Sequence, residues 1–565
     1  MRWLPGLAQL RGYQRSWLPG DLVAGLTVAA YLVPQVMAYS TLAGLPPVAG
    51  LWAILAPLAL YAVIGSSRQL SVGPESTTAL MTATVVAPLA AGDPARYAGL
   101  AAALAIAVGL LFLLAFAARL GFAADLLSKP ILVGYLAGVA CIMIVSQLGK
   151  LTGVPVGGDS FVGHLVSFVR HLPELHPATL LFGTAVLAFL LVGQWRFPAL
   201  PVPLLAVLLA TAAVVVFDLE RYGISVVGPI PRGLPTPTLP GLGDLPQLLL
   251  PAAGVLVVGY TDTVLTARSF AARAERAPTS QRGGQVDNNQ ELLALGAGNL
   301  GAGVLHGFPI SSSGSRTALA VAAGSRTQLY SLVALGAVVM VLLLAGPLLA
   351  KFPTAALGAI VVYAALRLID VAGFRRLASF RRNEFLLAVA ALLGVLVFDI
   401  LYGVLLAVGL SVAEMLHRVA RPHDAIQGLV PDLAGMHDID DYPEAETIPG
   451  LVVYRYDSPL FFANAQDFHR RALAAVDAQP DPVAWFVLNV EANVEVDITA
   501  LDAVDELRVE LDRRGIVLAL ARVKRDLLDY LDAFGLTGSI GADRLFPTLP
   551  TAVEAYREWR RHPPA

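Results

Sequence analysis

The chain has 565 residues, of which 56% are hydrophobic and 14% are charged, and its mean hydropathy is +0.68. A soluble protein of this length would carry about 25% charged residues, so the composition excludes that class and predicts a polytopic membrane protein. The formal net charge of -3 excludes nothing, whereas the single cysteine, Cys141, excludes an intramolecular disulfide.

Fourteen hydrophobic segments follow one another up to residue 417, and most approach the roughly 20 residues that a helix needs to span a bilayer. They lie at about 20–36, 47–65, 76–90, 97–119, 130–149, 178–193, 200–217, 248–272, 290–305, 314–324, 328–349, 354–369, 384–399 and 401–417. The third and the tenth are short, which sets them apart from the others.

Charges in the connecting loops support an even number of spans. Arginines gather after even-numbered segments, as at Arg268, Arg375 and Arg418, and the loops after odd-numbered segments are balanced or acidic. The positive-inside rule then places both termini in the cytoplasm. We therefore expect a multi-pass protein of the inner or plasma membrane, surrounded by lipid, with cytoplasmic N- and C-termini.

The two short segments begin with the same pattern. The third opens on Gly73-Pro74-Glu75-Ser76-Thr77, and the tenth follows Pro309 and opens on Ser311-Ser312-Ser313-Gly314-Ser315-Arg316. Proline cannot continue a helix, and Ser and Thr are natural N-caps, so each helix is expected to begin inside the membrane. Such a start exposes unpaired N–H groups and roughly half a positive charge, which attracts an anion.

The two copies of the pattern lie seven spans apart, in segments three and ten. Seven is an odd number of crossings, so the second copy must enter the membrane from the opposite side. The sequence therefore predicts a 7+7 inverted repeat, with repeat one at about 15–217 and repeat two at about 245–420. Its two helix starts would face each other near the midplane, where such transporters bind their substrates.

Polar side chains at membrane depth are costly without a partner and are candidates for function. Gln35 directly follows Pro34, which frees a backbone carbonyl. Gln35 either contacts the substrate or forms a hydrogen bond between helices. Asp262 lies in the eighth segment, where desolvation favours its neutral form, as proton coupling requires. The alternative is a structural pair between Asp262 and Arg268 or Arg316.

The two helix starts carry different charges. Glu75 is either a second proton-binding group or an acid that neutralises the helix dipole. Arg316 either binds the anion or pairs with lipid or a carboxylate, and the serines of 311–315 either bind anion oxygens or cap the helix. Reversing the charge at Arg316 should therefore weaken anion binding, whereas neutralising Glu75 should act mainly on pH dependence.

No catalytic motif stands out in the sequence. The nine histidines show no metal-ligand spacing, and there is no phosphate-binding loop, Gly-x-Ser-x-Gly or His-Glu-x-x-His. We expect that the protein is not an enzyme, uses no cofactor other than a coupling ion, H⁺ or Na⁺, and has no nucleic-acid partner.

The composition changes after about residue 420. Residues 421–448, rich in His, Asp and Pro, are predicted to be a linker. Short apolar runs, such as 451–454, 485–488 and 516–520, then alternate with amphipathic helical patterns. This alternation predicts a small cytoplasmic α/β domain with a central sheet at 449–565.

The N-terminal half carries a specific family pattern. Gly25-Leu26-Thr27-Val28 is followed by Pro34-Gln35, Ala38-Tyr39 and Leu42-Ala43-Gly44-Leu45-Pro46-Pro47, and Ala267-Arg268-Ser269-Phe270-Ala271 follows Asp262. These segments resemble the SulP anion permeases, solute carrier family 26. The resemblance implies fourteen helices in an inverted repeat, divided into a core domain and a gate domain, with a C-terminal STAS domain and a homodimer. This family usually has Glu where Asp262 stands.

The soluble domain resembles STAS domains in Val496-Asp497-Ile498-Thr499-Ala500-Leu501. Related bacterial antagonists carry a phosphorylatable Ser where Thr499 stands, so Thr499 is either a regulatory site or a helix N-cap.

These observations together predict a secondary active anion transporter that works by alternating access, with a transport domain at 1–420. The favoured activity is proton-coupled symport of an inorganic or small carboxylate anion, resembling sulfate or a dicarboxylate. Sodium-coupled bicarbonate transport and an anion sensor that signals through the STAS domain are the alternatives. The predicted coupling residues are Asp262 and Glu75. The predicted anion-binding residues are Gln35, Tyr39, Glu75, Ser76, Thr77, Ser311, Ser312, Ser313, Gly314 and Arg316.

Overall fold

The chain forms two compact units, Met1–Ser411 and Val412–Ala565. They are known from a computed structural model, which describes residues 4–7, 12–125, 128–157, 160–197, 201–231, 233–241, 243–275 and 286–562. Each unit has its own hydrophobic core.

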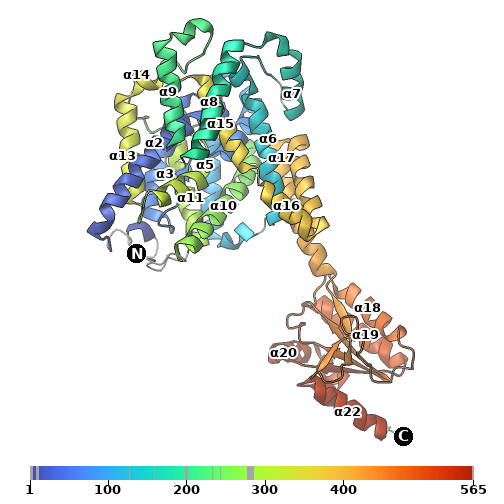
Figure 1. Cartoon of the computed structure of the whole chain (residues 1–565). Helices are drawn as coiled ribbons and strands as arrows, with labels where there is room; N and C mark the ends of the chain where they lie inside the picture. Colours follow the sequence, from blue (N-terminus) through green and yellow to red (C-terminus); the bar gives the residue numbers. More distant parts are fainter. Residues whose placement is uncertain are drawn as a thin grey trace. The chain divides into compact units, whose positions relative to one another are not determined.

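The first unit is built almost entirely from helices (Figure 1). Seven helical stretches among the described residues are long and apolar enough to cross a membrane, and α4, α9 and α13 are shorter apolar helices. The helices are α2 (Leu18–Leu42), α3 (Pro47–Ile64), α4 (Ser76–Ala90), α5 (Pro94–Ala117), α6 (Lys129–Thr152), α7 (Phe161–Arg170), α8 (Pro177–Arg196), α9 (Val202–Val216), α10 (Leu245–Glu275), α11 (Asn288–Val304), α12 (Gly314–Ala322), α13 (Leu329–Leu344), α14 (Gly346–Leu349), α15 (Thr354–Leu368), α16 (Val371–Phe380) and α17 (Arg382–Ala420).

Helix α17 turns back on itself. A methyl group on Gly403 would lie 2.7 Å from the Cα atom of Val395, whereas residues eight apart in a straight helix are about 12 Å apart. The two arms correspond to the predicted segments 384–399 and 401–417. With them, the fourteen predicted segments all have helical counterparts, and α7, α14 and α16 are short additional helices that the sequence analysis did not predict.

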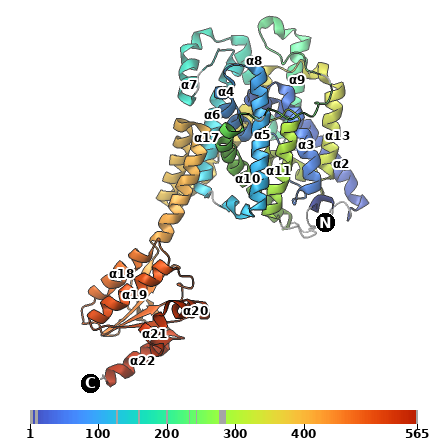
Figure 2. The same ribbon diagram turned by 180° about the vertical axis from the view of Figure 1, so that it is seen from behind.

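Glycines allow several helices of this unit to pack closely. Helices α5 and α11 run side by side (Figure 2), and a methyl group on Gly296 would lie 3.2 Å from the carbonyl oxygen of Gly109. A methyl group on Gly134 of α6 would lie only 1.8 Å from the carbonyl oxygen of Ala388 in α17. Small residues at such crossings are characteristic of helix packing in membranes.

The two short helices are joined by a two-stranded antiparallel sheet. Strand β1 (Val72–Gly73) pairs with β2 (Ser311–Ser312), with Val72 opposite Ser312 and Gly73 opposite Ser311. Helix α4 begins three residues after β1, and α12 begins two residues after β2. Because the strands are antiparallel, the chain enters α4 and α12 from opposite directions. This is the relation between the two starts that the inverted repeat predicts.

The second unit is an α/β domain around a six-stranded sheet, in the order β4-β3-β5-β6-β7-β8. Its strands are β3 (Asp424–Leu429), β4 (Met436–Asp438), β5 (Leu451–Tyr456), β6 (Trp485–Asn489), β7 (Val517–Ala521) and β8 (Leu545–Phe546). Its helices are α18 (Ala465–Asp477), α19 (Ile498–Arg513), α20 (Arg525–Phe534), α21 (Leu536–Ile540) and α22 (Leu549–Arg561). Strands β5 to β8 are parallel, and β3 pairs antiparallel with β4 and β5.

Both faces of this sheet are covered. Along β5, Val452 and Tyr454 belong to one hydrophobic cluster, whereas Leu451 and Val453 belong to another. This alternation follows from the two-residue period of a strand, and burial on both sides explains why the run is continuously apolar. Strands β3 and β4 lie within 421–448, so the segment predicted as a linker contributes two strands to the sheet.

Candidate anion-binding site

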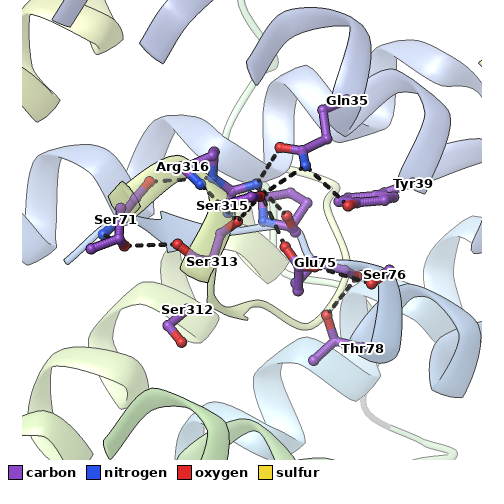
Figure 3. Close-up of polar contacts among 12 residues, drawn as sticks. Gln35, Tyr39, Ser71, Glu75, Ser76, Thr78, Ser312, Ser313, Ser315 and Arg316 are labelled. Atoms are coloured by element: carbon purple, nitrogen blue, oxygen red, sulfur yellow. Dashed lines mark hydrogen bonds and ion pairs between the residues drawn. The ribbon is translucent and has the colours of Figure 1, made fainter. Parts of the chain in front are cut away.

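Arg316 lies where the two helix starts meet, and it is completely buried. Its Nη1 donates to the carbonyl oxygen of Pro74 at 2.9 Å and to Gln35 Oε1 at 3.1 Å, and its Nε donates to Ser71 Oγ at 3.2 Å (Figure 3). One arginine of the second repeat therefore joins α2 and the loop before α4. A buried charge requires such partners because its transfer from water is costly.

Gln35 connects the first helix to the second helix start. Its Nε2 donates to Tyr39 Oη at 3.0 Å and to Ser315 Oγ at 3.5 Å, and its Oε1 accepts from Arg316. Ser315 Oγ lies 3.2 Å from Ser313 Oγ, so the network continues to the N-cap of α12. The helix–helix alternative for Gln35 describes these contacts, which join α2 to α12, and a direct contact with the substrate stays a prediction.

The start of α4 is incompletely satisfied. Glu75 is its N-cap residue, and no side chain caps the helix. Ser76 Oγ donates to Glu75 Oε1 at 3.0 Å, and Glu75 Oε2 lies 3.8 Å from Arg316 Nη1. Among the described residues, no acceptor is recorded for the backbone N–H groups of residues 76–78. These are orphan donors at the positive end of a helix.

One nitrogen of Arg316 is also unsatisfied. Its Nη2 is buried and has no hydrogen-bond partner within the described part of the chain. Almost all buried polar groups in proteins have partners, so an orphan of this kind needs an explanation. The guanidinium and the orphan N–H groups of α4 together form a donor set that suits an oxyanion.

The second helix start is capped by its own serine. Ser313 Oγ accepts from the backbone N–H of Arg316 at 3.5 Å, which supports the capping alternative for this part of the cluster. Asp262 lies beside the same strand, where its Oδ2 accepts from Ser312 Oγ at 3.1 Å. Among the described residues, the ion pair of Arg316 is with Glu75 and not with Asp262, and the pairing of Asp262 with Arg268 stays an alternative. Arg316 is too buried to reach a lipid surface, which contradicts its pairing with lipid, whereas Glu75 Oε2 at 3.8 Å from its Nη1 leaves the carboxylate alternative open.

The predicted site residues thus fall into two neighbouring groups. The Arg316 group contains Gln35, Tyr39, Glu75, Ser76 and Ser313, and the second is the pair of Asp262 and Ser312. No dashed line joins Ser312 to the Arg316 group in Figure 3.

Three predicted site residues remain, Ser311, Gly314 and Thr77. Among the described residues, none of them has a recorded polar side-chain contact. Ser311 pairs with Gly73, and Gly314 opens α12. The side chain of Thr77 is buried, and no hydrogen bond of it is recorded among the described residues.

Three contacts of Arg316 and Gln35 were not predicted. They involve Ser71, the carbonyl of Pro74 and Ser315. All three lie within the repeated pattern or directly before it, so position in the pattern is the signal that could have found them.

In the second unit, Thr499 is exposed on α19. Asp497, and not Thr499, caps this helix, because its Oδ1 accepts from the backbone N–H of Ala500 at 2.8 Å. The N-cap alternative for Thr499 is therefore wrong. In the described ranges, no group of three or more His, Cys, Asp or Glu residues could hold a metal ion.

The fold and the paired half-helices define a polytopic helical membrane transporter with a C-terminal α/β domain. Residues 18–391 match the model of the sulfate permease family, and residues 442–552 match the STAS domain. The chain therefore belongs to the sulfate permease family and carries a C-terminal STAS domain.

Similar proteins agree with this assignment. A Mycobacterium tuberculosis protein named "Probable sulfate transporter MT1781" is 60% identical over 98% of both chains. "Sulfate transporter 4.1, chloroplastic" of Arabidopsis thaliana is 30% identical over 97% of this chain and 82% of its own. The solved structure of the murine Slc26a9 anion transporter in its inward-facing state matches 98% of this chain and 94% of its own, with a TM-score of 0.89 and 23% identity.

Proposed function

We propose that this protein transports sulfate across the cell membrane by alternating access and binds it where α4 and α12 begin. The observation that carries the proposal is the orphan Nη2 of Arg316 beside the uncapped start of α4. Two helix starts contribute about one positive charge, Arg316 adds another, and Glu75 removes one when ionised. A dianion such as sulfate is then best balanced if protons accompany it. The names of the mycobacterial and plant relatives favour sulfate over other anions of this class.

We propose that Asp262 couples this anion to protons. Ser312 Oγ donates to Asp262 Oδ2, and Ser312 pairs through β2 with β1, which leads into α4. A proton on Asp262 removes its negative charge close to the proposed site and changes the acceptor that Ser312 meets. Asp262 therefore favours anion binding when it is protonated. Protonation of Glu75 at the start of α4 likewise removes negative charge and favours the anion.

Transport into proteoliposomes tests both parts of the proposal. We expect an inward proton gradient to accelerate uptake of radiolabelled sulfate by the wild-type protein. The Asp262→Asn variant, in which the side chain stays neutral, should still exchange sulfate but lose the acceleration. Thr261→Ser, a conservative change at the neighbouring position, is the control and should keep it.

Other outcomes would replace the proposal. Proton-driven uptake that survives Asp262→Asn would refute the coupling role. Dependence on sodium together with bicarbonate uptake would favour sodium-coupled bicarbonate transport. Sulfate binding without any flux would favour a membrane sensor that signals through the STAS domain.

Topology and assembly belong to the same proposal. We propose that both termini and the STAS domain lie in the cytoplasm, because the arginines of α16 and the following turn, Arg375, Arg376, Arg381 and Arg382, then obey the positive-inside rule. We further propose that the protein works as a homodimer, that the transport domain covers 1–420, and that Thr499 is a regulatory position on the exposed start of α19. Labelling of single cysteines in a Cys141→Ser background from either side of the membrane would test the topology.

A further inference from the structure

A second polar cavity lies away from the paired half-helices. It has a volume of about 420 Å³ and is formed by the carboxyl end of α6, the amino ends of α8 and α15, and the loop around Gly223. Its polar lining residues are Lys150, Glu174, His176, Thr179, Ser225 and Thr354. The Arg316 site is built instead from α2, α4, α12 and the two short strands, so the two sites share no residue.

Lys150 is held against the first turns of α15. A methyl group on Gly358 would lie 3.2 Å from Lys150 Cβ and 3.7 Å from its Cδ, so α15 packs closely on the lysine stem at this glycine. Lys150 lines the cavity, and no ion pair or hydrogen bond of its ammonium is recorded among the described residues. A lysine at such a place normally has a counter-ion.

Several groups around the cavity are donors as well, although Gln147 Oε1, a buried acceptor without a partner among the described residues, lies beside the same glycine as the Lys150 stem. Thr354 N–H donates to the carbonyl of Ser225 at 2.9 Å and Ala356 N–H to that of Pro353 at 3.1 Å, so the N–H of Ala355 remains as the donor without a recorded acceptor. The amino end of α15 carries the positive end of its helix dipole. The amino ends of α8 and α15 thus bring two positive dipole ends to the cavity, whereas the carboxyl end of α6, in whose last turn Lys150 lies, brings one negative end.

His176 supplies a further donor. Its Nδ1 accepts from the backbone N–H of Thr179 at 3.3 Å and lies 2.8 Å from Thr179 Oγ1, an arrangement that fits a neutral imidazole with its ring proton on Nε2. Nε2 has no recorded partner within the described residues. The only acid that lines the cavity is Glu174, which is exposed to solvent and makes no ion pair with Lys150 within 4 Å. A net excess of donors and positive charge therefore faces this cavity.

We propose that this cavity binds a small oxyanion, such as sulfate or the phosphate of a lipid headgroup, between Lys150, His176 and the amino end of α15. The bound anion bridges α6, α8 and α15, the fifth, sixth and twelfth of the predicted segments; we expect segments five to seven and twelve to fourteen to form the gate domain. Occupancy then holds these three helices together, and the anion modulates transport without itself being the transported ion.

Hydrogen–deuterium exchange of the full-length protein in detergent tests the proposal, with sodium sulfate as the probe and sodium gluconate at matched ionic strength as the blank. We expect sulfate to protect peptides at the amino ends of α8 and α15 in the wild-type protein. In Lys150→Met, the sulfate concentration for half-maximal protection should rise about tenfold or more, because a charge-assisted contact is lost. The matched control is Lys351→Met, which removes a lysine that is exposed and already paired with Glu220 at 2.7 Å.

Two further comparisons keep the test decisive. Lys150→Arg should retain protection, and His176→Gln should weaken it, even if Lys150→Met folds poorly. Phosphatidylglycerol in place of sulfate, with phosphatidylcholine as its blank, shows whether the oxyanion is a free ion or a lipid phosphate. Protection of these peptides by either one supports an oxyanion site. The proposal is overturned if neither protects these peptides, or if Lys150→Met is protected as well as Lys351→Met. Protection of peptides at α4 and α12 reports on the transport site separately.

Discussion

At the scale of single residues, Arg316 determines the chemistry of the site. Its Nη1 and Nε are satisfied by Gln35, Ser71 and Pro74, while its Nη2 is buried without a partner. The satisfied donors fix the plane of the guanidinium, and the remaining donor is left for an incoming group. Such preorganisation avoids a cost of orientation on binding.

Arg316→Lys should therefore weaken sulfate binding about 10- to 100-fold, because lysine keeps the charge but cannot reproduce a planar set of donors. Equilibrium binding of radiolabelled sulfate to the purified protein measures this. Arg326→Lys is the control, since Arg326 is exposed and its recorded contact is through its backbone N–H to Asp21. Equal affinities of the two variants would contradict the role of Arg316.

The sequence could identify the residue types of the site but not its connections. The doubled pattern pointed to Arg316, Glu75 and the serines, because proline followed by hydroxyl residues has a local physical meaning. The contact between Gln35 and Arg316 joins residues 281 positions apart, and no local pattern carries that information. The contribution of the Pro74 carbonyl is a backbone effect that residue identity does not reveal.

At the scale of elements, the β1–β2 pair sets the distance between the two helix starts. A Cβ atom on Gly73 would lie 1.8 Å from Ile54 Cδ1 and 3.5 Å from Arg316 Nη2, so any larger residue there must displace Ile54 or the strand. The close packing of α3 against β1 therefore contributes directly to the position of the guanidinium.

Gly73→Ala should destabilise the protein by about 1–3 kcal/mol and weaken sulfate binding, because the methyl group displaces Ile54 or β1. Ile54→Val removes Cδ1, the atom with which the new methyl group would clash. The double variant should therefore recover much of the lost stability and of the lost sulfate affinity. A double-mutant cycle on thermal stability and sulfate affinity measures the coupling. Gly99→Ala is the control, since nothing lies within 4 Å of a methyl group there. Additive effects of Gly73→Ala and Ile54→Val would be inconsistent with this packing.

Helices could be predicted from the sequence where each has a long apolar segment of its own. The apolar segments of the transport unit appear as helices, and the reversal of α17 agrees with two separate segments. Helix α16 was not predicted, because a single amphipathic stretch rich in arginine looks like a loop when only apolar length is counted. Strands β3 and β4 were taken for a linker, because their polar sequences are stabilised by strand pairing, of β3 with β5 and of β4 with β3, rather than by local propensity.

At the scale of the whole molecule, the two units obey different physical rules. The first is stabilised by close packing of apolar helices, whereas the second contains networks of charged side chains typical of a soluble domain. In the second unit, Tyr454 Oη donates to Asp424 Oδ2 at 2.8 Å, and Arg471 forms ion pairs with Asp424 and Asp467.

This network predicts how the free energy of unfolding of the second unit changes at alkaline pH. Burial, and then the hydrogen bond to Asp424, raise the pKa of Tyr454 well above its usual value of about 10. The folded pKa is the higher one, so this contribution to stability is complete below pH 10 and is lost as the pH rises above it. Tyr454→Phe should cost about 1 kcal/mol at neutral pH and make stability fall less steeply above pH 10. Urea unfolding, followed by the fluorescence of Trp485 in the full-length protein with its other tryptophans replaced by Phe, measures this. An unchanged slope above pH 10 would refute it.

The central claim is that a tetrahedral oxyanion binds between the starts of α4 and α12. Selenate has the shape and charge of sulfate and scatters anomalously, so a crystal of the protein soaked in selenate locates it directly. We expect an anomalous peak at a position from which the selenate oxygens reach Arg316 Nη2 and the backbone N–H groups of Ser76 and Thr77 by hydrogen bonds. Anomalous peaks elsewhere, with none at these donors, would contradict it.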